Sequence, residues 1–231
     1  LIKDTGYYLM KKINIAIDGP SAAGKSSVAE RLADSLSYVH LDTGSMYRAI
    51  AYYVDYKGFS LNDEEAILAL LNETEMTVLN DGTIKVNDLL LKKELYGDKI
   101  SLMASDVSKL LGVRKAMVAL QQKIAANKGY IVDGRDICEV VLPDAEVKIY
   151  LTASAEARAM RRYKQNQEKG IESNYEDILK DIEKRDYQDM HRENSPLRQA
   201  NDATLVDSSN MSLDETVDTI LNLVKEKMKN D

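Results

Sequence analysis

One glycine-rich run near the start of the chain has the residue types and the spacing of a phosphate-binding loop. Residues 19–26 read Gly-Pro-Ser-Ala-Ala-Gly-Lys-Ser, which fits the pattern G-x-x-x-x-G-K-S. Glycines let such a loop turn its backbone N–H groups toward an anion, and a helix that begins there adds partial positive charge. Lys25 would neutralise the β- and γ-phosphates, and the Ser26 hydroxyl would ligate Mg²⁺. The run predicts a nucleoside triphosphate site formed by Gly19, Pro20, Ser21, Ala22, Ala23, Gly24, Lys25, Ser26 and Ser27.

The segments on either side of this run are those that a phosphate-binding loop needs. The apolar residues 13–18 predict a strand, and residues 26–36 place Val28, Leu32 and Leu36 at helical spacing. A chance glycine-rich turn would seldom combine Lys-Ser with both correct flanks. The order strand, loop, helix therefore favours the phosphate-binding interpretation.

Short apolar runs alternate with helical patterns along most of the chain. Further strands are predicted at residues 38–42, 129–133, 147–151 and 203–207. Such alternation predicts an α/β fold of the P-loop type, in which helices cover a five-stranded parallel sheet. Capping boxes at Ser173 with Glu176 and at Ser212 with Glu215 predict the starts of two helices.

Residues 76–86 break this alternation because they read as two antiparallel strands around a tight turn. They indicate a small insert in one domain, which we expect to cover residues 10–231. We expect residues 1–9 to be an extension or a cloning remnant. The net charge of −7 argues against a general nucleic-acid binder, and no run approaches the roughly 20 apolar residues that span a membrane. The single cysteine, Cys138, excludes an intrachain disulfide and fits a reducing cytoplasm.

Charged residues recur at positions where a second phosphate could bind. Arg135 and Asp136 follow a predicted strand, at the edge where open α/β sheets bind ligands. Asp133 ends that strand and could either support a magnesium site or cap the next turn. Each helical arginine alone could be solvated, but clusters near a P-loop favour phosphoryl transfer. Two helical sets share a face by their spacing: Arg158, Arg161 and Arg162, and then Arg185, Asp189 and Arg192.

Several longer runs resemble the bacterial cytidylate kinase family. They are Leu-Asp-Thr-Gly-Ser-Met-Tyr-Arg at 41–48, Asp-Gly-Arg-Asp at 133–136, residues 140–146, and Arg-Asp-x-x-Asp-x-x-Arg-x-x-Ser-Pro at 185–196. The resemblance implies transfer of the γ-phosphoryl group of ATP to CMP or dCMP, with Mg²⁺, by a cytoplasmic monomer. It also implies a nucleotide-binding insert at about 62–112 and a mobile lid at about 154–172.

The resemblance further implies a role for each matching position. Lys25 would act in catalysis with the lid residues Arg158, Arg161 and Arg162, and Asp133 could reach Mg²⁺ through water. The positions expected to bind CMP are Thr43, Arg48, Ser105, Arg114, Arg135, Asp136, Arg185, Asp189 and Arg192. Among these, four arginines (48, 135, 185 and 192) would hold the acceptor phosphate, and Asp189 would accept from the ribose hydroxyls.

The base-reading residues Ser105, Arg114 and Asp136 make chemical sense for cytosine. Asp136 and Ser105 can accept from the N4 amino group, and Arg114 can donate to N3 and O2. Uracil reverses the polarity at position 4 and at N3, and such a site can reject a mispaired analogue by up to about 10⁴-fold. The sequence departs from the family pattern at Ile137-Cys138-Glu139, where Ile-Gly-Thr is usual. A side chain at 138 could shift the loop, although a buried, inert thiol is expected there.

Three other interpretations remain open from the sequence alone. A kinase for another monophosphate such as UMP would share the P-loop but not the cytosine-reading residues. A nucleotide-binding regulator would bind one nucleotide and turn it over slowly. A nucleic-acid-binding ATPase would need an exposed basic surface, which the acidic balance of the chain disfavours.

Overall fold

The computed structural model describes residues 12–79 and 81–230, and within them five parallel strands form the central sheet. The strand order is β2-β6-β1-β7-β8, and the five parallel strands confirm the predicted sheet of the P-loop type. The strands are β1 (Ile15–Asp18), β2 (Val39–Asp42), β6 (Tyr130–Gly134), β7 (Val147–Thr152) and β8 (Thr204–Asp207). In the register, Asp18 lies opposite Gly134, and Asp42 lies opposite Asp133. The polar ends of β1, β2 and β6 therefore meet at one edge of the sheet.

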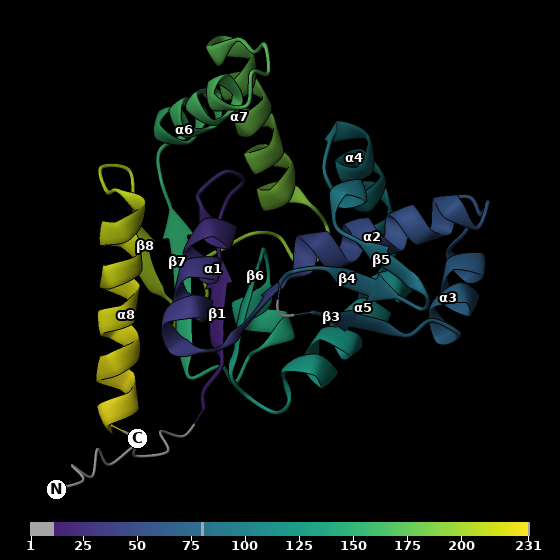
Figure 1. Cartoon of the computed structure of the whole chain (residues 1–231), viewed down its shortest axis with the longest axis horizontal. Coiled ribbons are helices and arrows are strands. Elements are labelled where there is room, and N and C mark those ends of the chain that lie inside the picture. Colours follow the sequence, from purple (N-terminus) through teal and green to yellow (C-terminus); the bar gives the residue numbers. More distant parts are fainter. Residues whose placement is uncertain (1–11, 80, 231) are drawn as a thin grey trace, which may run out of the picture.

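Helices cover both faces of this sheet (Figure 1). Ile15 and Ile17 of β1 pack with α1 (Lys25–Leu36) and α8 (Leu213–Asn230). Ala16 faces the other side, toward α2 (Thr43–Tyr56) and α5 (Leu111–Ala125). Burial on both faces explains why the strands read as continuous apolar runs.

A second, smaller sheet lies beside α2 and is built by the chain between α2 and α5. Its strands are β3 (Met76–Val78), β4 (Ile84–Val86) and β5 (Leu89–Leu91), all antiparallel, with α3 (Glu64–Asn72) before them and η1 (Lys93–Leu95) and α4 (Asp98–Val107) after them. The β3–β4 hairpin was predicted, although Asn80 in its turn lies outside the described residues. The third strand was not, because three leucines in a row show no alternation.

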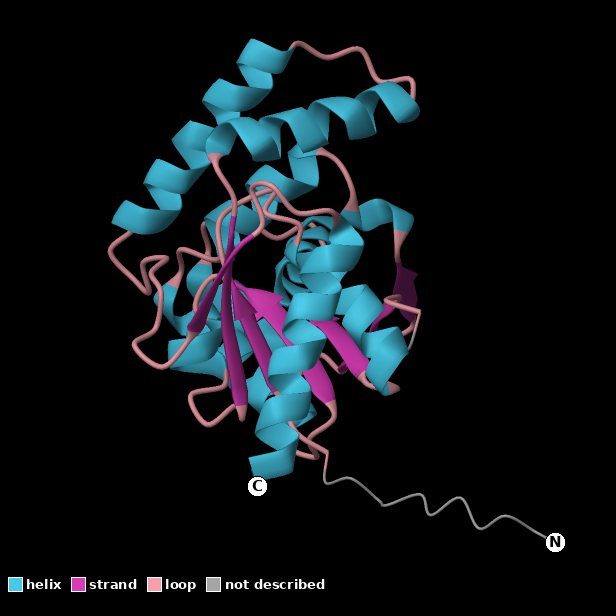
Figure 2. Cartoon of the chain, turned by 90° about the vertical axis from the view of Figure 1, so that its left-hand side faces the viewer, coloured by secondary structure: helices cyan, strands magenta, loops and turns pink. Residues whose placement is uncertain are grey.

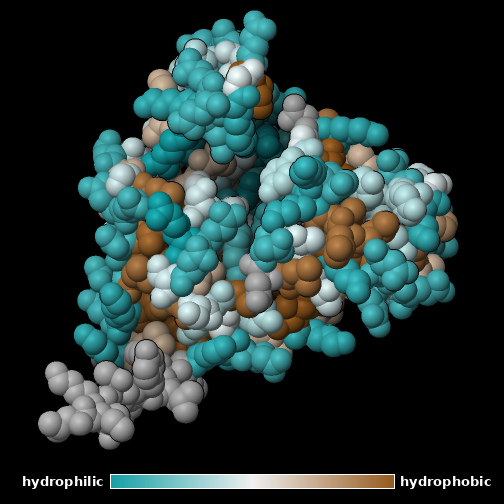
Figure 3. Space-filling model, in the orientation of Figure 1, coloured by the Kyte–Doolittle hydropathy of each residue, from teal (hydrophilic) through white to brown (hydrophobic). Residues whose placement is uncertain are grey.

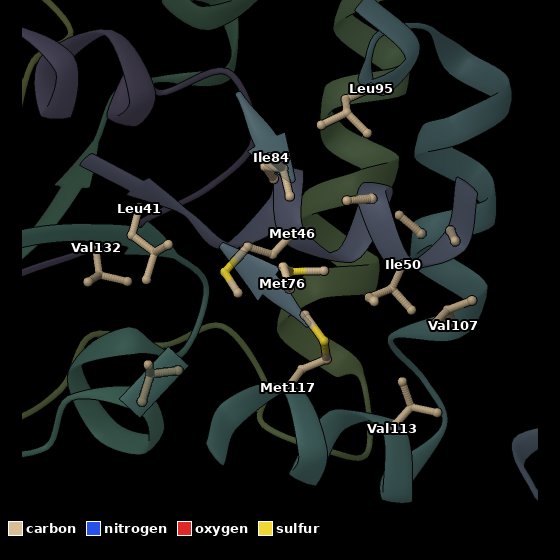
Figure 4. Close-up of a cluster of buried hydrophobic side chains, with 14 of the residues drawn as sticks. Leu41, Met46, Ile50, Met76, Ile84, Leu95, Val107, Val113, Met117 and Val132 are labelled. Atoms are coloured by element: carbon tan, nitrogen blue, oxygen red, sulfur yellow. The ribbon is translucent and has the colours of Figure 1, made fainter. Parts of the chain in front are cut away.

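The core between the two sheets contains three methionine side chains, from α2, β3 and α5 (Figure 4). Met46, Met76 and Met117 are almost completely buried there. Unbranched thioether side chains fill irregular gaps between elements that cross at different angles. This packing fixes the insert and α5 against the main sheet, and α5 carries one of the expected site residues.

Helices α6 (Ala155–Glu168) and α7 (Tyr175–His191) lie beyond the carboxyl ends of the strands, as a quarter turn of the view makes clear (Figure 2). The cap predicted for α7 was wrong: Asn174 accepts from the backbone N–H groups of Glu176 and Asp177, at 2.8 and 3.2 Å. Ser173 instead has a buried hydroxyl that hydrogen-bonds no residue in the described part of the chain. The other predicted capping box is confirmed, since Ser212 and Glu215 hydrogen-bond reciprocally at 2.8 and 3.2 Å.

Candidate active site

The glycine-rich loop joins β1 to α1 and is held close against β7. A Cβ atom on Gly19 would lie 1.9 Å from the carbonyl oxygen of Leu151, so only glycine fits. Gly24 takes a left-handed conformation, with φ of 89°, as the N-cap of α1. The loop therefore lies at the positive end of that helix. Lys25 is buried and donates to the Pro20 carbonyl at 2.9 Å, and burial together with nearby Arg135 lowers its pKa to about 7.

Asp133 accepts from Ser26 rather than capping the turn that follows β6. Its Oδ2 accepts from the Ser26 hydroxyl at 3.0 Å, and its Oδ1 pairs with His40 Nε2 at 2.6 Å. Burial alone would raise the pKa of Asp133, but the hydrogen bond and charge of His40 hold it below its usual range. Of the two interpretations left open, this geometry matches an acid that supports the P-loop serine. Thr43, also buried, donates to the backbone carbonyl of Asp133 at 2.8 Å.

Asp18 is a buried carboxylate that the sequence analysis did not select. Its two oxygens accept from the backbone N–H groups of Ile137 and Cys138, both at 2.8 Å. Burial raises the pKa of Asp18 above its ordinary value. These contacts fix the start of the π-helix η2 (Ile137–Val141), directly after the predicted base-reading residue.

Cys138 is accommodated in that turn without entering the site. Its Sγ lies 3.7 and 3.8 Å from the carbonyl oxygens of Ala16 and Ile149, between two strands of the sheet. The side chain is fully buried, as expected, and burial raises the pKa of the thiol. The cysteine side chain, at a position where the family usually has glycine, therefore packs in the core.

Several arginine side chains lie close enough to one another and to Lys25 for their charges to interact. The surface below α6 and α7 is hollowed and largely hydrophilic (Figure 3). Arg48 Nη2 donates to Asp42 Oδ2 at 3.0 Å and to the Ser45 hydroxyl at 2.5 Å. Arg135 Nε donates to Asp189 Oδ2 at 2.6 Å. These carboxylates occupy one side of each guanidinium and leave other nitrogen atoms available.

The electrostatics of this cluster favour an anionic ligand. Desolvation and nearby Arg135 lower the pKa of Arg185, and burial together with Arg114 lowers the pKa of Arg192. Two buried nitrogen atoms, Arg48 Nε and Arg192 Nη2, have no hydrogen-bond partner among the described residues. Buried donors are nearly always paired in native proteins, so an acceptor from a ligand is expected at this point.

Two of the three predicted base-reading residues are hydrogen-bonded to each other. Arg114 Nη2 donates to Asp136 Oδ2, and the two side chains are only 9% and 10% exposed. The third residue, Ser105, is exposed on α4 and its hydroxyl hydrogen-bonds no described residue. Arg114 Nε also lies 3.4 Å from the hydroxyl of Ser195, a contact that the sequence analysis did not find.

The three arginines expected in the lid have three different surroundings, although they share a helix face by spacing. Arg158 is buried and donates to the carbonyls of Ala153 and Ser21 and to Asp186. Arg161 donates to the carbonyls of Ser208 and Met211 instead. Arg162 is exposed, and its charge contributes to the lowered pKa of Arg185.

The parallel sheet, the glycine-rich loop and the adjoining charged cleft define a kinase fold of the P-loop class. A gluconokinase from Sinorhizobium meliloti has the same fold, with a TM-score of 0.50 at 15% identity over 95% of each chain. Among the described residues, no helix combines the length and the apolar character needed to cross a membrane.

Sequence comparison assigns the chain to one family within that class. The family model described as cytidylate kinase matches residues 15–226, and the chain belongs to the cytidylate kinase family. A cytidylate kinase of Caldicellulosiruptor bescii is 44% identical over 225 residues, which are 96% of this chain and 100% of the relative. One from Bacillus velezensis is 46% identical over 222 residues, 95% of this chain and 99% of the relative. The family resemblance noted in the sequence is thereby confirmed.

Proposed function

We propose that the protein transfers the γ-phosphoryl group of ATP to CMP or dCMP, giving CDP or dCDP and ADP. Its relatives carry the name of this activity. The observation that carries the proposal is the arginine cluster near Lys25, in which two buried nitrogen atoms have no hydrogen-bond acceptor among the described residues. A site for one nucleotide needs the P-loop alone, whereas a second cationic cluster fits an acceptor phosphate.

In the proposed reaction, an oxygen of the acceptor phosphate bonds to the γ-phosphorus as the bond to the bridging oxygen breaks and ADP leaves. The attacking oxygen is already ionised at neutral pH, so no general base is assigned. Arg48, Arg135 and Arg192, with Arg185, would hold the acceptor phosphate in line. Lys25 and the lid arginines would neutralise charge on the transferred group.

The Arg114–Asp136 pair supports cytosine over uracil. An ionised carboxylate accepts from the N4 amino group of cytosine but faces a carbonyl oxygen in uracil. The second oxygen of Asp136 makes no hydrogen bond to a described residue, and Ser105 would have to approach from α4 to join the pair. The alternative of a UMP kinase is disfavoured because it would leave this buried carboxylate facing another acceptor.

The residues around Ser26 fit a magnesium ion. Mg²⁺ prefers oxygen ligands, keeps several waters and is usually bound with substrate phosphates. The Ser26 hydroxyl and the Asp133 carboxylate, 3.0 Å apart, are such a donor set, with Asp133 acting through water. The ion would supply neutralisation of phosphate charge, while this chain orients the serine through Asp133.

We also propose that residues at about 62–112 form the acceptor-binding insert and those at about 154–172 a lid. Closure of the lid would exclude water from the site. This exclusion matters because water in an open P-loop site would hydrolyse ATP. We further predict that the protein is cytoplasmic, that it is a monomer and that it binds no nucleic acid. Size-exclusion chromatography with light scattering tests the oligomeric state, and measurements of binding to labelled DNA and RNA test the prediction on nucleic acid.

The test is ADP formation from ATP and Mg²⁺ with CMP, dCMP, UMP, AMP or no acceptor. Turnover confined to CMP and dCMP is expected. Comparable turnover with UMP would overturn the base-reading assignment. Bound ATP without acceptor-dependent turnover would instead favour a regulator that uses the nucleotide as a signal.

A further inference from the structure

Ser195 holds an unfavourable backbone conformation in the segment that follows α7. Its φ is +49°, in the left-handed region, which costs a residue with a side chain roughly 1 kcal/mol or more. Glycine or asparagine is the usual choice at such a position. In this conformation both oxygens of Ser195 lie within hydrogen-bond distance of arginine side chains.

The two oxygens of Ser195 contact the two arginines that the proposed function assigns to different parts of CMP. The hydroxyl accepts from Arg114 Nε at 3.4 Å, and the backbone carbonyl accepts from Arg192 Nε at 2.6 Å. Arg114 comes from α5 beside the base-reading Asp136, whereas Arg192 ends α7 among the phosphate-binding arginines. One residue thus lies between both halves of the acceptor site.

The backbone around Ser195 is fixed on its far side. The N–H of Leu197 donates to the carbonyl of Asp189 at 2.8 Å, and the Leu197 side chain is buried. Arg198 donates to Glu139 on η2 at 2.8 Å. Ser195 therefore moves with the carboxyl end of α7 and with the turn after Asp136.

Arg114 depends on few contacts for its orientation. Ser195 borders a cleft of about 620 Å³ that is also lined by Asp136, and a second of about 260 Å³ that is also lined by Arg114. Arg114 is buried, and among the described residues only Asp136 and Ser195 hydrogen-bond its guanidinium. A planar guanidinium is oriented by two such contacts, on Nε and Nη2, while Nη1 makes no hydrogen bond to a described residue.

Resting on the proposed function, we propose that Ser195 is a positioning residue that couples base recognition to phosphate placement. Its hydroxyl orients Arg114 toward the cytosine, and its carbonyl orients Arg192 toward the acceptor phosphate. Nucleotides that are held correctly at the base are then also held in line at the phosphate. The left-handed backbone of Ser195 places both oxygens for these contacts, and the two contacts offset its conformational cost.

Two substitutions separate the hydroxyl from the backbone strain. Ser195→Gly removes the hydroxyl and relieves the strain, whereas Ser195→Thr keeps the hydroxyl but adds a branched side chain that is disfavoured at positive φ. We expect Ser195→Gly to keep or raise the Tm, to raise the KM for CMP about tenfold, and to lower the CMP-to-UMP ratio of kcat/KM by a similar factor. Ser195→Thr should lower the Tm and keep that ratio.

Steady-state kinetics with CMP, UMP and ATP test whether the Ser195 hydroxyl positions Arg114. Asn194→Ala is the matched control, because Asn194 is exposed and lies next to Ser195 in the chain. The KM for ATP should change less than about twofold in every variant. A Ser195→Gly enzyme with the wild-type KM for CMP and the wild-type ratio would overturn this inference alone. A wild-type enzyme that phosphorylates no CMP would overturn the proposed function and this inference with it.

Discussion

The guanidinium of Arg158 donates to the backbone carbonyl of Ser21 at 2.9 Å and so joins α6 to the P-loop. The same side chain donates to Asp186 Oδ2 of α7 at 2.6 Å. Arg158 is therefore a junction between the nucleotide-binding loop and the two helices above it. A displacement of α6 or α7 would therefore also displace the backbone at Ser21, in the loop proposed to bind the donor phosphates.

Replacing Arg158 by alanine should destabilise the protein strongly. Asp186 would keep a largely buried carboxylate with no partner, and loss of one partner of a buried pair costs about 3–5 kcal/mol. For a chain of this size, the Tm should fall by at least about 6 °C. Differential scanning calorimetry measures this. The matched control is Arg31→Ala, because the Arg31–Asp214 pair is mostly exposed and should contribute little. Equal Tm values for the two variants would contradict the role of Arg158 as a junction.

Asp136→Asn should weaken base discrimination while leaving ATP binding intact. An asparagine amide can donate to the O4 of uracil, which the carboxylate cannot do. We expect the CMP-to-UMP ratio of kcat/KM to fall by at least about tenfold and the KM for ATP to change less than about twofold. Competition assays with both acceptors measure the ratio. Asp144→Asn, the same change at an exposed aspartate just after that helical turn, serves as the control. An unchanged ratio in Asp136→Asn would show that another group reads the base.

Local sequence patterns predicted most of the fold because each depends on residues close in the chain. The P-loop, the five strands and the β3–β4 hairpin are of this kind. The errors arise where a local pattern has two solutions. At the start of α7 both Ser173 and Asn174 can cap, and the side-chain oxygen of Asn174 does so while the hydroxyl of Ser173 is buried.

The residues that the sequence could not identify act through contacts between distant segments. Asp18 caps the turn at Ile137, 119 residues later, and Ser195 contacts Arg114, 81 residues earlier. His40 lies in a short strand and belongs to no motif in the sequence. Its contribution to the site is seen only from its contact with Asp133, at 2.6 Å. Helical spacing also grouped Arg158 with Arg161, but spacing says nothing about which loops surround each side chain.

Lys25 should make the stability of the nucleotide-free protein depend on pH. Its pKa is lowered from 10.5 to about 7 by burial and by Arg135, so between these values the unfolded chain binds more protons than the folded protein. Stability contributed by this group therefore rises with pH from about 7 to 10.5. Lys25→Met removes the cost of the buried amine, and its Tm should exceed that of wild type by about 5 °C or more at pH 6.

The difference in Tm between Lys25→Met and wild type should narrow at pH 9, where wild-type Lys25 is already neutral in the folded state. Thermal unfolding at pH 6 and pH 9 without nucleotide provides the measurement. Lys164→Met, at an exposed position of α6, controls for the loss of one surface charge. A difference that stays constant with pH would mean that the amine is not the titrating group. ATP binding should be lost in Lys25→Met at both pH values.

Cys138 should be unreactive toward thiol reagents while the protein is folded. Its thiol is enclosed between the carbonyls of Ala16 and Ile149, and burial and the charge of Asp18 raise its pKa, so the reactive thiolate is scarce at pH 8. Because the chain has a single cysteine, a chromogenic disulfide reagent should label nothing in the native protein and one thiol per chain in denaturant. Adding Ser35→Cys, at an exposed position of α1, should give rapid labelling of one site.

Fast labelling of the folded wild-type protein would place the thiol at the surface, beside Asp136. Slow labelling that follows the unfolding rate would show that this departure from the family pattern is part of the core.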